Sequence, residues 1–347
     1  RPTAEVLTIA ERLVDAADDG QRASDILEVG ASFLEQLAPR SLGKGELGHF
    51  LRLKESYADA LLHQARMTEA LAAFDDLHGY VREGSLVAAT ERDAFYHHYV
   101  NAQLHTAHFV SALRVLDLWQ RCAPSSPWYH FLQYDRRAGA YNAFGDAPRA
   151  LESLTRALDI AHGAQNPFAE GIAHYDVGYV HIHVTHERES VIAAFTRSLD
   201  VDPSGAQGAP WRVIELHQQR AIIRLLQGDP EVALEHVEDA LWLSKRNHLV
   251  IYEVKLANLA AACHIIRGRH DAARDILLRG RSIALLYRNE RAYWRAMANL
   301  GALVAIASGP AAAVGELAAA EARLRTWFAA QHSFSMELPI LANYLAV

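Results

Sequence analysis

Cysteine is scarce in this sequence, with only Cys122 and Cys263 in 347 residues. Two thiols so far apart in the chain cannot supply a disulfide framework or a cysteine-based zinc cluster. We expect both to be reduced and mostly buried, as is usual for cysteines of a cytoplasmic protein.

Long apolar runs are also missing, since no stretch reaches the roughly 18 residues that span a bilayer. The first residues, RPTAEVLTIAERL, are amphipathic and lack the apolar segment of a signal peptide. We therefore expect no membrane insertion and a cytoplasmic location. The chain begins with Arg1 and not with methionine, which is compatible with a segment of a longer protein.

A strongly basic balance and the common catalytic motifs are absent as well. The net charge of −7 and the pI near 6.3 argue against direct nucleic-acid binding by this chain. The sequence contains no Gly-x-Ser-x-Gly, His-Glu-x-x-His or Gly-x-x-x-x-Gly-Lys motif. We expect neither an enzyme nor a cofactor.

What the sequence does contain is an internal repeat. The segments GDAPRALESLTRALDIA (145–161), GDPEVALEHVEDALWLS (228–244) and GRHDAARDILLRGRSIA (268–284) each place a small residue five positions after a glycine. Glycine can end a helix in the left-handed conformation, and the Asp or Pro that follows can begin the next helix. The three segments therefore predict a turn followed by an amphipathic helix.

The repeat extends along most of the chain with a period of about 40 residues. A bulky apolar residue follows each small residue at +4, which is one face of a helix, and a second amphipathic stretch precedes it. We predict an all-α protein with a leading helical hairpin in 1–45, seven helix-turn-helix units over 46–328 and a C-terminal capping helix in 329–347. The repeated small position is occupied by Ala70, Ala112, Ala150, Val191, Ala233, Ala273 and Ala313.

These units resemble the tetratricopeptide repeat family. Leu300, Gly301, Ala313, Leu317 and Ala320 match its pattern of packing residues, and so do Ala138, Tyr141, Ala150, Leu154 and Ala157. The resemblance implies a right-handed α-solenoid with a concave groove. The units are longer than the usual 34 residues, and in this they resemble the sensor arrays of bacterial transcription activators of the maltose-regulator type.

The resemblance also implies which residues face the groove, because the first helix of each unit lines it. Aromatic side chains beside adaptable hydrogen-bonding groups suit a recognition surface, although a solvated helix face is polar in any case. We expect the partner to be a peptide, a protein segment or a small polar ligand. The candidate groove residues are His97, His98, Asn101, His105, Asp135, Arg136, Tyr175, Asp176, Tyr179, His183, Gln218 and Gln219.

A dense histidine run, AHYDVGYVHIHVTHERES (173–190), raises the alternative of a metal site at His174, His181, His183 and His186. In the repeat frame His174 and His181 fall on packing positions. On a regular helix His181 and His183 point about 200° apart, so a compact three-histidine site would require a break in the helix. We interpret the run as repeat packing. A pH- or ligand-sensitive cluster that includes His183 and His186 is the second alternative, and metal binding is the weakest.

Two interpretations of function stay open. One is the sensor part of a bacterial transcription regulator, which changes its curvature or its self-association when a ligand binds and whose output domain lies outside this chain. The other is a passive scaffold or adaptor for protein partners. A bounded pocket in the middle units favours the sensor, and an open groove with an exposed apolar patch favours the scaffold.

Overall fold

The computed structural model describes residues 23–34, 44–64, 66–82, 88–106, 108–205, 209–247, 249–286 and 290–330. These residues form helices and short connections, and none of them belongs to a strand. A π-helical turn, η2 (His181–Thr185), directly follows α9. The α-helices are α2 (Ala23–Leu34), α3 (Lys44–His63), α4 (Met67–Arg82), α5 (Ala89–His105), α6 (Phe109–Gln120), α7 (Pro127–Ala143), α8 (Ala147–Gly163), α9 (Pro167–Val180), α10 (Arg188–Val201), α11 (Pro210–Leu226), α12 (Pro230–Arg246), α13 (Val250–Ile266), α14 (His270–Leu286), α15 (Glu290–Ser308) and α16 (Pro310–Ala330).

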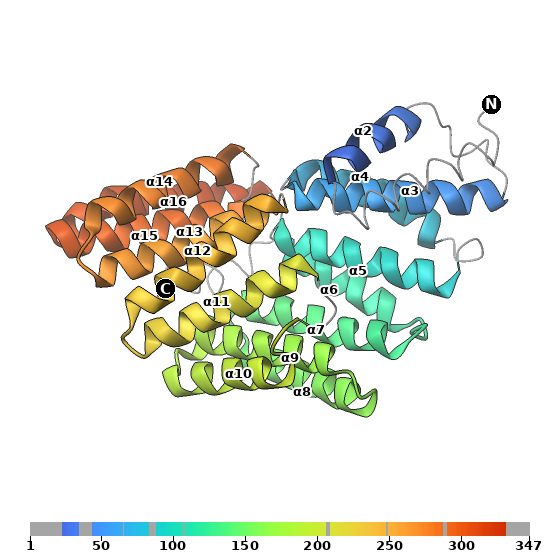
Figure 1. Cartoon of the computed structure of the whole chain (residues 1–347). Helices are drawn as coiled ribbons and strands as arrows, with labels where there is room; N and C mark the ends of the chain where they lie inside the picture. The colour runs from blue at the N-terminus through green and yellow to red at the C-terminus, as the bar shows by residue number, and fades with distance from the viewer. Residues whose placement is uncertain are drawn as a thin grey trace.

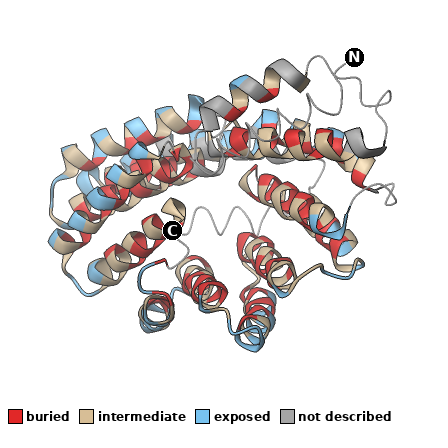
Figure 2. Cartoon of the chain, turned by 45° about the vertical axis from the view of Figure 1, so that its right-hand side comes forward, coloured by how far each residue is buried: buried red, intermediate tan, exposed pale blue. Residues whose placement is uncertain are grey.

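The helices pack as successive hairpins along a curved path, from α3–α4 to α15–α16 (Figure 1). Odd-numbered helices also contact one another from hairpin to hairpin, as in α5 with α7 and α13 with α15. Buried residues lie between the helices along the whole curve (Figure 2). The prediction of an all-α solenoid is confirmed.

A leading hairpin and a capping helix were predicted at the two ends of the chain. The predicted leading hairpin of 1–45 is described only at α2 and the start of α3. The predicted capping helix of 329–347 lies outside the described residues, except for the last two residues of α16. Among the helices that the structure describes, none is both long and apolar enough to cross a membrane.

Glycine and acidic caps set the hairpin turns, as the sequence predicts. Gly145, Gly228 and Gly268 have φ values of 74°, 86° and 69°, a conformation that costs glycine little. The side chain of Asp146 then accepts a hydrogen bond from the backbone NH of Arg149 at 3.1 Å and so caps α8. A short turn therefore separates the helices of a hairpin and keeps them antiparallel.

The repeated small residues are the contact points inside each hairpin. All seven are buried, with at most 3% of their surface exposed. A small side chain lets the two helix backbones approach, and the apolar residue four positions later fills the adjoining space. Phe74, Leu116, Leu154, Phe195, Val237 and Leu277 occupy that later position and are also buried.

Gly178 lies where α9 packs tightly against α10. A Cβ atom at this position would lie 2.3 Å from the ring of Phe195 on α10. We expect Gly178→Ala to lower the free energy of unfolding by about 1–3 kcal/mol, because the added carbon overpacks the interface. Urea denaturation measures the change. Gly79→Ala, where a Cβ meets nothing within 4 Å, is the control, and equal effects at the two sites would contradict the prediction.

Candidate functional site

The concave side of the solenoid contains a cavity of about 420 Å³. Its walls come from α3, α5, α7, α9 with η2, α11, α13 and α15, the first helices of seven consecutive hairpins. No second helix of a hairpin contributes a lining residue among those described. The solenoid therefore collects side chains from more than 230 residues of sequence, Asp59 to Arg295, around one space.

Most of the predicted groove residues line this cavity. Gln219 does not: it is fully buried, and neither its side-chain nitrogen nor its oxygen has a hydrogen-bond partner in the described structure. One residue along an α-helix turns the side chain by about 100°, so Gln219 points away from the space that its neighbour faces. The predicted groove residues that line the cavity are His97, His98, Asn101, His105, Asp135, Arg136, Tyr175, Asp176, Tyr179, His183 and Gln218.

The centre of the cavity is acidic. Asp135 on α7 is buried, and the guanidinium of Arg136 lies 3.0 Å from its Oδ2. Burial raises the pKa of Asp176 on α9 well above its ordinary value, and the negative charge of Asp135 and a hydrogen bond to it raise the pKa further. The carboxyl group of Asp176 therefore holds its proton to a higher pH than an exposed aspartate does.

Tyrosines and an amide form a hydrogen-bonded wall beside these carboxyl groups. The hydroxyl of Tyr175 donates to Oε1 of Gln218 at 3.3 Å, and Nε2 of Gln218 donates to the hydroxyl of Tyr179 at 2.5 Å. On α13, Tyr252 donates to Oε1 of Glu215 at 3.1 Å. Burial raises the pKa of Tyr179 to about 12, so this phenol is a neutral donor and acceptor at physiological pH.

Basic side chains come from the last two hairpins. Lys255 and Arg295 line the cavity together with the amide of Asn258. The guanidinium of Arg295 donates to Nε2 of His183 at 2.7 Å, and the amide of Asn142 lies 3.3 Å from Nδ1 of the same ring. Because Arg295 and His183 are 112 residues apart, this hydrogen bond joins α15 to η2 across the concave side.

The first hairpins contribute a histidine–carboxylate group. Nδ1 of His98 lies 2.9 Å from Oδ1 of Asp59, and its Nε2 lies 3.8 Å from Oε1 of Glu55. Burial lowers the pKa of the adjacent His97 well below its ordinary value, so His97 is neutral. Burial also raises the pKa of Glu55 to about 7. The cavity thus offers carboxyl, imidazole, phenol, amide and cationic groups within one space.

Sequence analysis missed several lining residues, most of them after Gln218. The repeat period could have found some of them, because Tyr175, Glu215, Lys255 and Arg295 follow one another at intervals of 40 residues and all line the cavity. Asn258 likewise follows Gln218 by 40 residues. The missed lining residues with polar or aromatic side chains include Trp211, Glu215, Tyr252, Lys255, Asn258 and Arg295.

The histidine run does not come together as a metal site. His181 and His183 lie in the π-helical turn, and His186 ends it with φ of 56°, so the expected regular helix is interrupted here. Nevertheless, only His183 faces the cavity, while Nδ1 of His181 bonds the hydroxyl of Thr185 at 2.9 Å. Among the described residues, none of His174, His181, His183 and His186 belongs to a group of three or more potential ligand residues that converge on one point. The alternative of metal binding at this run therefore gains no support.

Comparison with known proteins identifies the fold. No family model and no curated protein sequence matches this chain. Among solved structures, a Rap protein complexed with competence and sporulation factor is similar with a TM-score of 0.58 and 12% identity, over 99% of this chain and 98% of that one. The fold is that of a tetratricopeptide-repeat solenoid. The resemblance inferred from the packing residues is confirmed at this level.

Two further structures share this tetratricopeptide fold. A signal-transduction ATPase with a tetratricopeptide repeat sensor from Pyrococcus horikoshii has a TM-score of 0.51 and 13% identity, over 93% of this chain and 49% of that protein. NprR in complex with its cognate peptide NprX has a TM-score of 0.50 and 13% identity, over 84% and 81%. At such identities the similarity establishes the fold and not the ligand.

Proposed function

We propose that this chain is a non-catalytic sensor module whose cavity binds a short peptide or a small polar ligand. The observation that carries the proposal is the cavity of about 420 Å³ with lining side chains from seven hairpins. This volume lies within the range of about 300–1,000 Å³ that is typical of small-ligand sites. The hydrogen bond between Arg295 and His183 joins distant hairpins across the concave side, and this favours a ligand site over the open groove that we expect of a passive scaffold.

The distribution of charge in the cavity supports a ligand with groups of both signs. The carboxyl groups of Asp135, Asp176 and Glu215 can accept hydrogen bonds from an amino group, and Lys255 and Arg295 favour a carboxylate or another anion. A short peptide with a free amino or carboxyl group has this chemistry. The Rap and NprR structures, which share the fold, were solved with peptides, and this supports the same ligand class.

A sensor must also change state when its ligand binds. The cavity is built from all the hairpins, so a ligand that contacts several of them favours one curvature of the solenoid over another. We propose that the module serves a cytoplasmic transcription regulator. A scaffold that presents the same groove to a protein segment is the second candidate.

The first test is native mass spectrometry of the purified protein, before and after mild denaturation. We expect a peptide or small molecule that leaves on denaturation. If the native protein contains no bound ligand, the next measurement is a thermal-shift screen with di- to pentapeptides of mixed charge. A failure of every peptide, together with the recovery of a protein partner, would contradict the sensor and favour the scaffold.

Lys255 provides the residue-level test of the same proposal. We expect Lys255→Ala to weaken binding of the peptide found in that screen by about 10- to 100-fold, because a hydrogen bond to a charged group is lost. Isothermal titration measures the affinity. The matched control is Lys245→Ala, because Lys245 is exposed on α12 and does not line the cavity. Equal affinities of the two variants would exclude a role of Lys255 in the site.

A further inference from the structure

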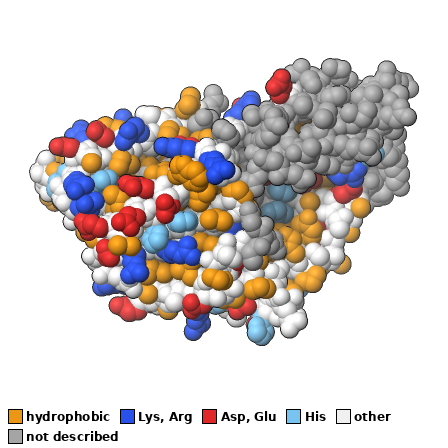
Figure 3. All heavy atoms as spheres, in the orientation of Figure 1, with side chains coloured by type: hydrophobic (Ala, Val, Ile, Leu, Met, Phe, Trp, Pro, Cys, Tyr) orange, Lys and Arg blue, Asp and Glu red, His pale blue; other side chains and the backbone are white. Residues whose placement is uncertain are grey.

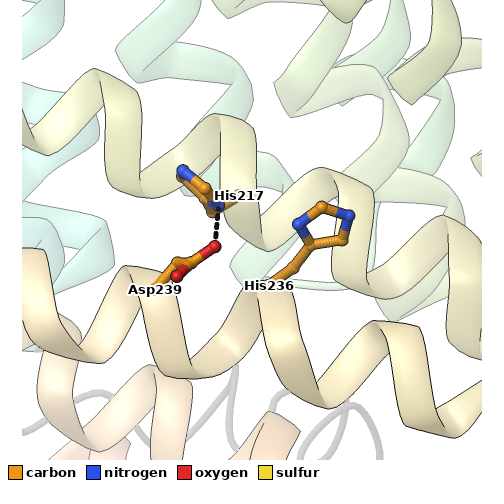
Figure 4. A group of neighbouring side chains, drawn as sticks. All are labelled: His217, His236 and Asp239. Atoms are coloured by element: carbon orange, nitrogen blue, oxygen red, sulfur yellow. Dashed lines mark ion pairs between the residues drawn. The ribbon is translucent and has the colours of Figure 1, made fainter.

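A second group of polar side chains lies outside the cavity, between the two helices of one hairpin. His217 lies on α11, and His236 and Asp239 lie on α12 (Figure 4). One ligand atom of each residue lies within 4.8 Å of the others. His236 and Asp239 are three residues apart on one helix, so they share a face, and His217 meets that face from the neighbouring helix.

The ring nitrogens of this group have unused hydrogen-bonding capacity. Nδ1 of His217 lies 3.7 Å from Oδ2 of Asp239, which is too long for a hydrogen bond. Nδ1 of His217 and Nδ1 of His236 are both buried, and neither has a hydrogen-bond partner in the described part of the chain. A buried polar atom without a partner costs free energy, and a bound ion would remove that cost.

We infer that His217, His236 and Asp239 form a binding site for a divalent transition metal ion of the zinc class. Two imidazoles and one carboxylate are a common ligand set for Zn²⁺, Co²⁺ and Ni²⁺, with water in the remaining positions. Bonds of about 2.0–2.2 Å require the three ligand atoms to move closer together. Asp239 can move, because 65% of its side chain is exposed.

The surroundings of the group permit access by an ion. Histidine side chains lie at the surface among charged side chains on the face that includes α11 and α12 (Figure 3). Arg220 and Arg224 carry positive charge near His236, which limits the affinity. The guanidinium of Arg220 donates a hydrogen bond to the carbonyl oxygen of Pro203 at 3.0 Å. None of the three ligand residues lines the cavity, so this inference and the proposed function can fail independently.

The test is a titration of the untagged, chelator-treated chain with Zn²⁺ in competition with a chromophoric indicator. We expect one equivalent to bind, with an affinity reduced at least tenfold in His236→Ala. Even the loss of a residue that only supports a metal ligand weakens binding by about 10- to 100-fold. Asp239→Asn should reduce the affinity as well. Addition of Zn²⁺ should raise the unfolding temperature of the wild type but not that of His236→Ala.

A matched control separates this site from the other histidines of the chain. His162 is exposed at the end of α8, and His162→Ala should bind Zn²⁺ like the wild type. A wild-type chain that binds no stoichiometric Zn²⁺ would overturn the inference. Retention of the full affinity in His236→Ala and in the His217→Ala/His236→Ala double variant would overturn it as well.

Discussion

Replacement of Arg212 by methionine is expected to lower the free energy of unfolding by about 3–5 kcal/mol. No part of the Arg212 side chain is exposed. Its Nε donates to Oδ2 of Asp202 at 2.9 Å, its Nη2 donates to Oγ of Ser198 at 3.2 Å, and its Nη1 lies 3.4 Å from Oε2 of Glu215. Methionine fills much of the same volume but leaves the buried carboxylate of Asp202 without its counter-charge.

Urea denaturation of matched variants checks this result. Arg156→Met removes an exposed pair with Glu152 on α8, and its effect should stay below about 0.5 kcal/mol. The double variant Arg212→Met/Asp202→Asn also removes the charge of Asp202 and should recover part of the lost stability, because one of the two buried carboxylates that face Arg212 is then neutral. An effect of Arg212→Met as small as that of Arg156→Met would show that water reaches this ion pair.

The repeat pattern was sufficient to predict the fold. Small residues such as Ala150 and Ala233 recur at one position because two helix backbones approach there, and every unit faces the same steric demand. Gly145 and Gly228 recur because each turn needs a left-handed residue. These are local requirements that repeat along the chain, so they leave a period in the sequence.

The cavity could be predicted only in part. The repeat period indicates which positions face the concave side, but it was not followed through the last hairpins. The frame assigned Tyr175 and Tyr179 to the groove, and both line the cavity. The prediction stopped before Lys255 and Arg295, which lie 40 and 80 residues after Glu215. Gln219 was a wrong assignment to the groove. Its neighbour faces the cavity, and a helix allows only one of the two to do so.

Contacts between distant hairpins do not produce a periodic pattern in the sequence. The hydrogen bond from Arg295 to His183 depends on the curvature of the whole solenoid and on the π-helical turn of η2. The approach of His217 to His236 depends on how far two helices have rotated about their axes. Curvature and rotation result from many small packing contacts, so a single sequence does not reveal which of its histidines will meet.

Replacement of Glu55 by glutamine is expected to raise the free energy of unfolding by about 3 kcal/mol at pH 8. Burial raises the pKa of Glu55 from 4.5 to about 7, the charge of His98 opposes this shift, and Asp59 and Glu91 add to it. Each pH unit between the folded and unfolded pKa corresponds to about 1.36 kcal/mol. Glutamine resembles the protonated carboxyl group and has no proton to lose.

The sign of the effect follows from which state binds the proton more tightly. Below pH 4.5 both states of the wild type hold the proton, so wild type and Glu55→Gln should unfold at similar urea concentrations. Between pH 4.5 and about 7 the unfolded chain ionises first, and the wild type loses stability as the pH rises. Above pH 7 the difference between the two proteins should be constant.

Urea denaturation at pH 4, 6 and 8 measures this difference. Glu152→Gln changes an exposed carboxylate on α8 and should alter stability by less than about 0.5 kcal/mol at any of these values. A stabilisation by Glu55→Gln that is the same at pH 4 and pH 8 would contradict the prediction. A growing difference would show that the solenoid gives up stability to keep an ionisable carboxyl group buried near His98.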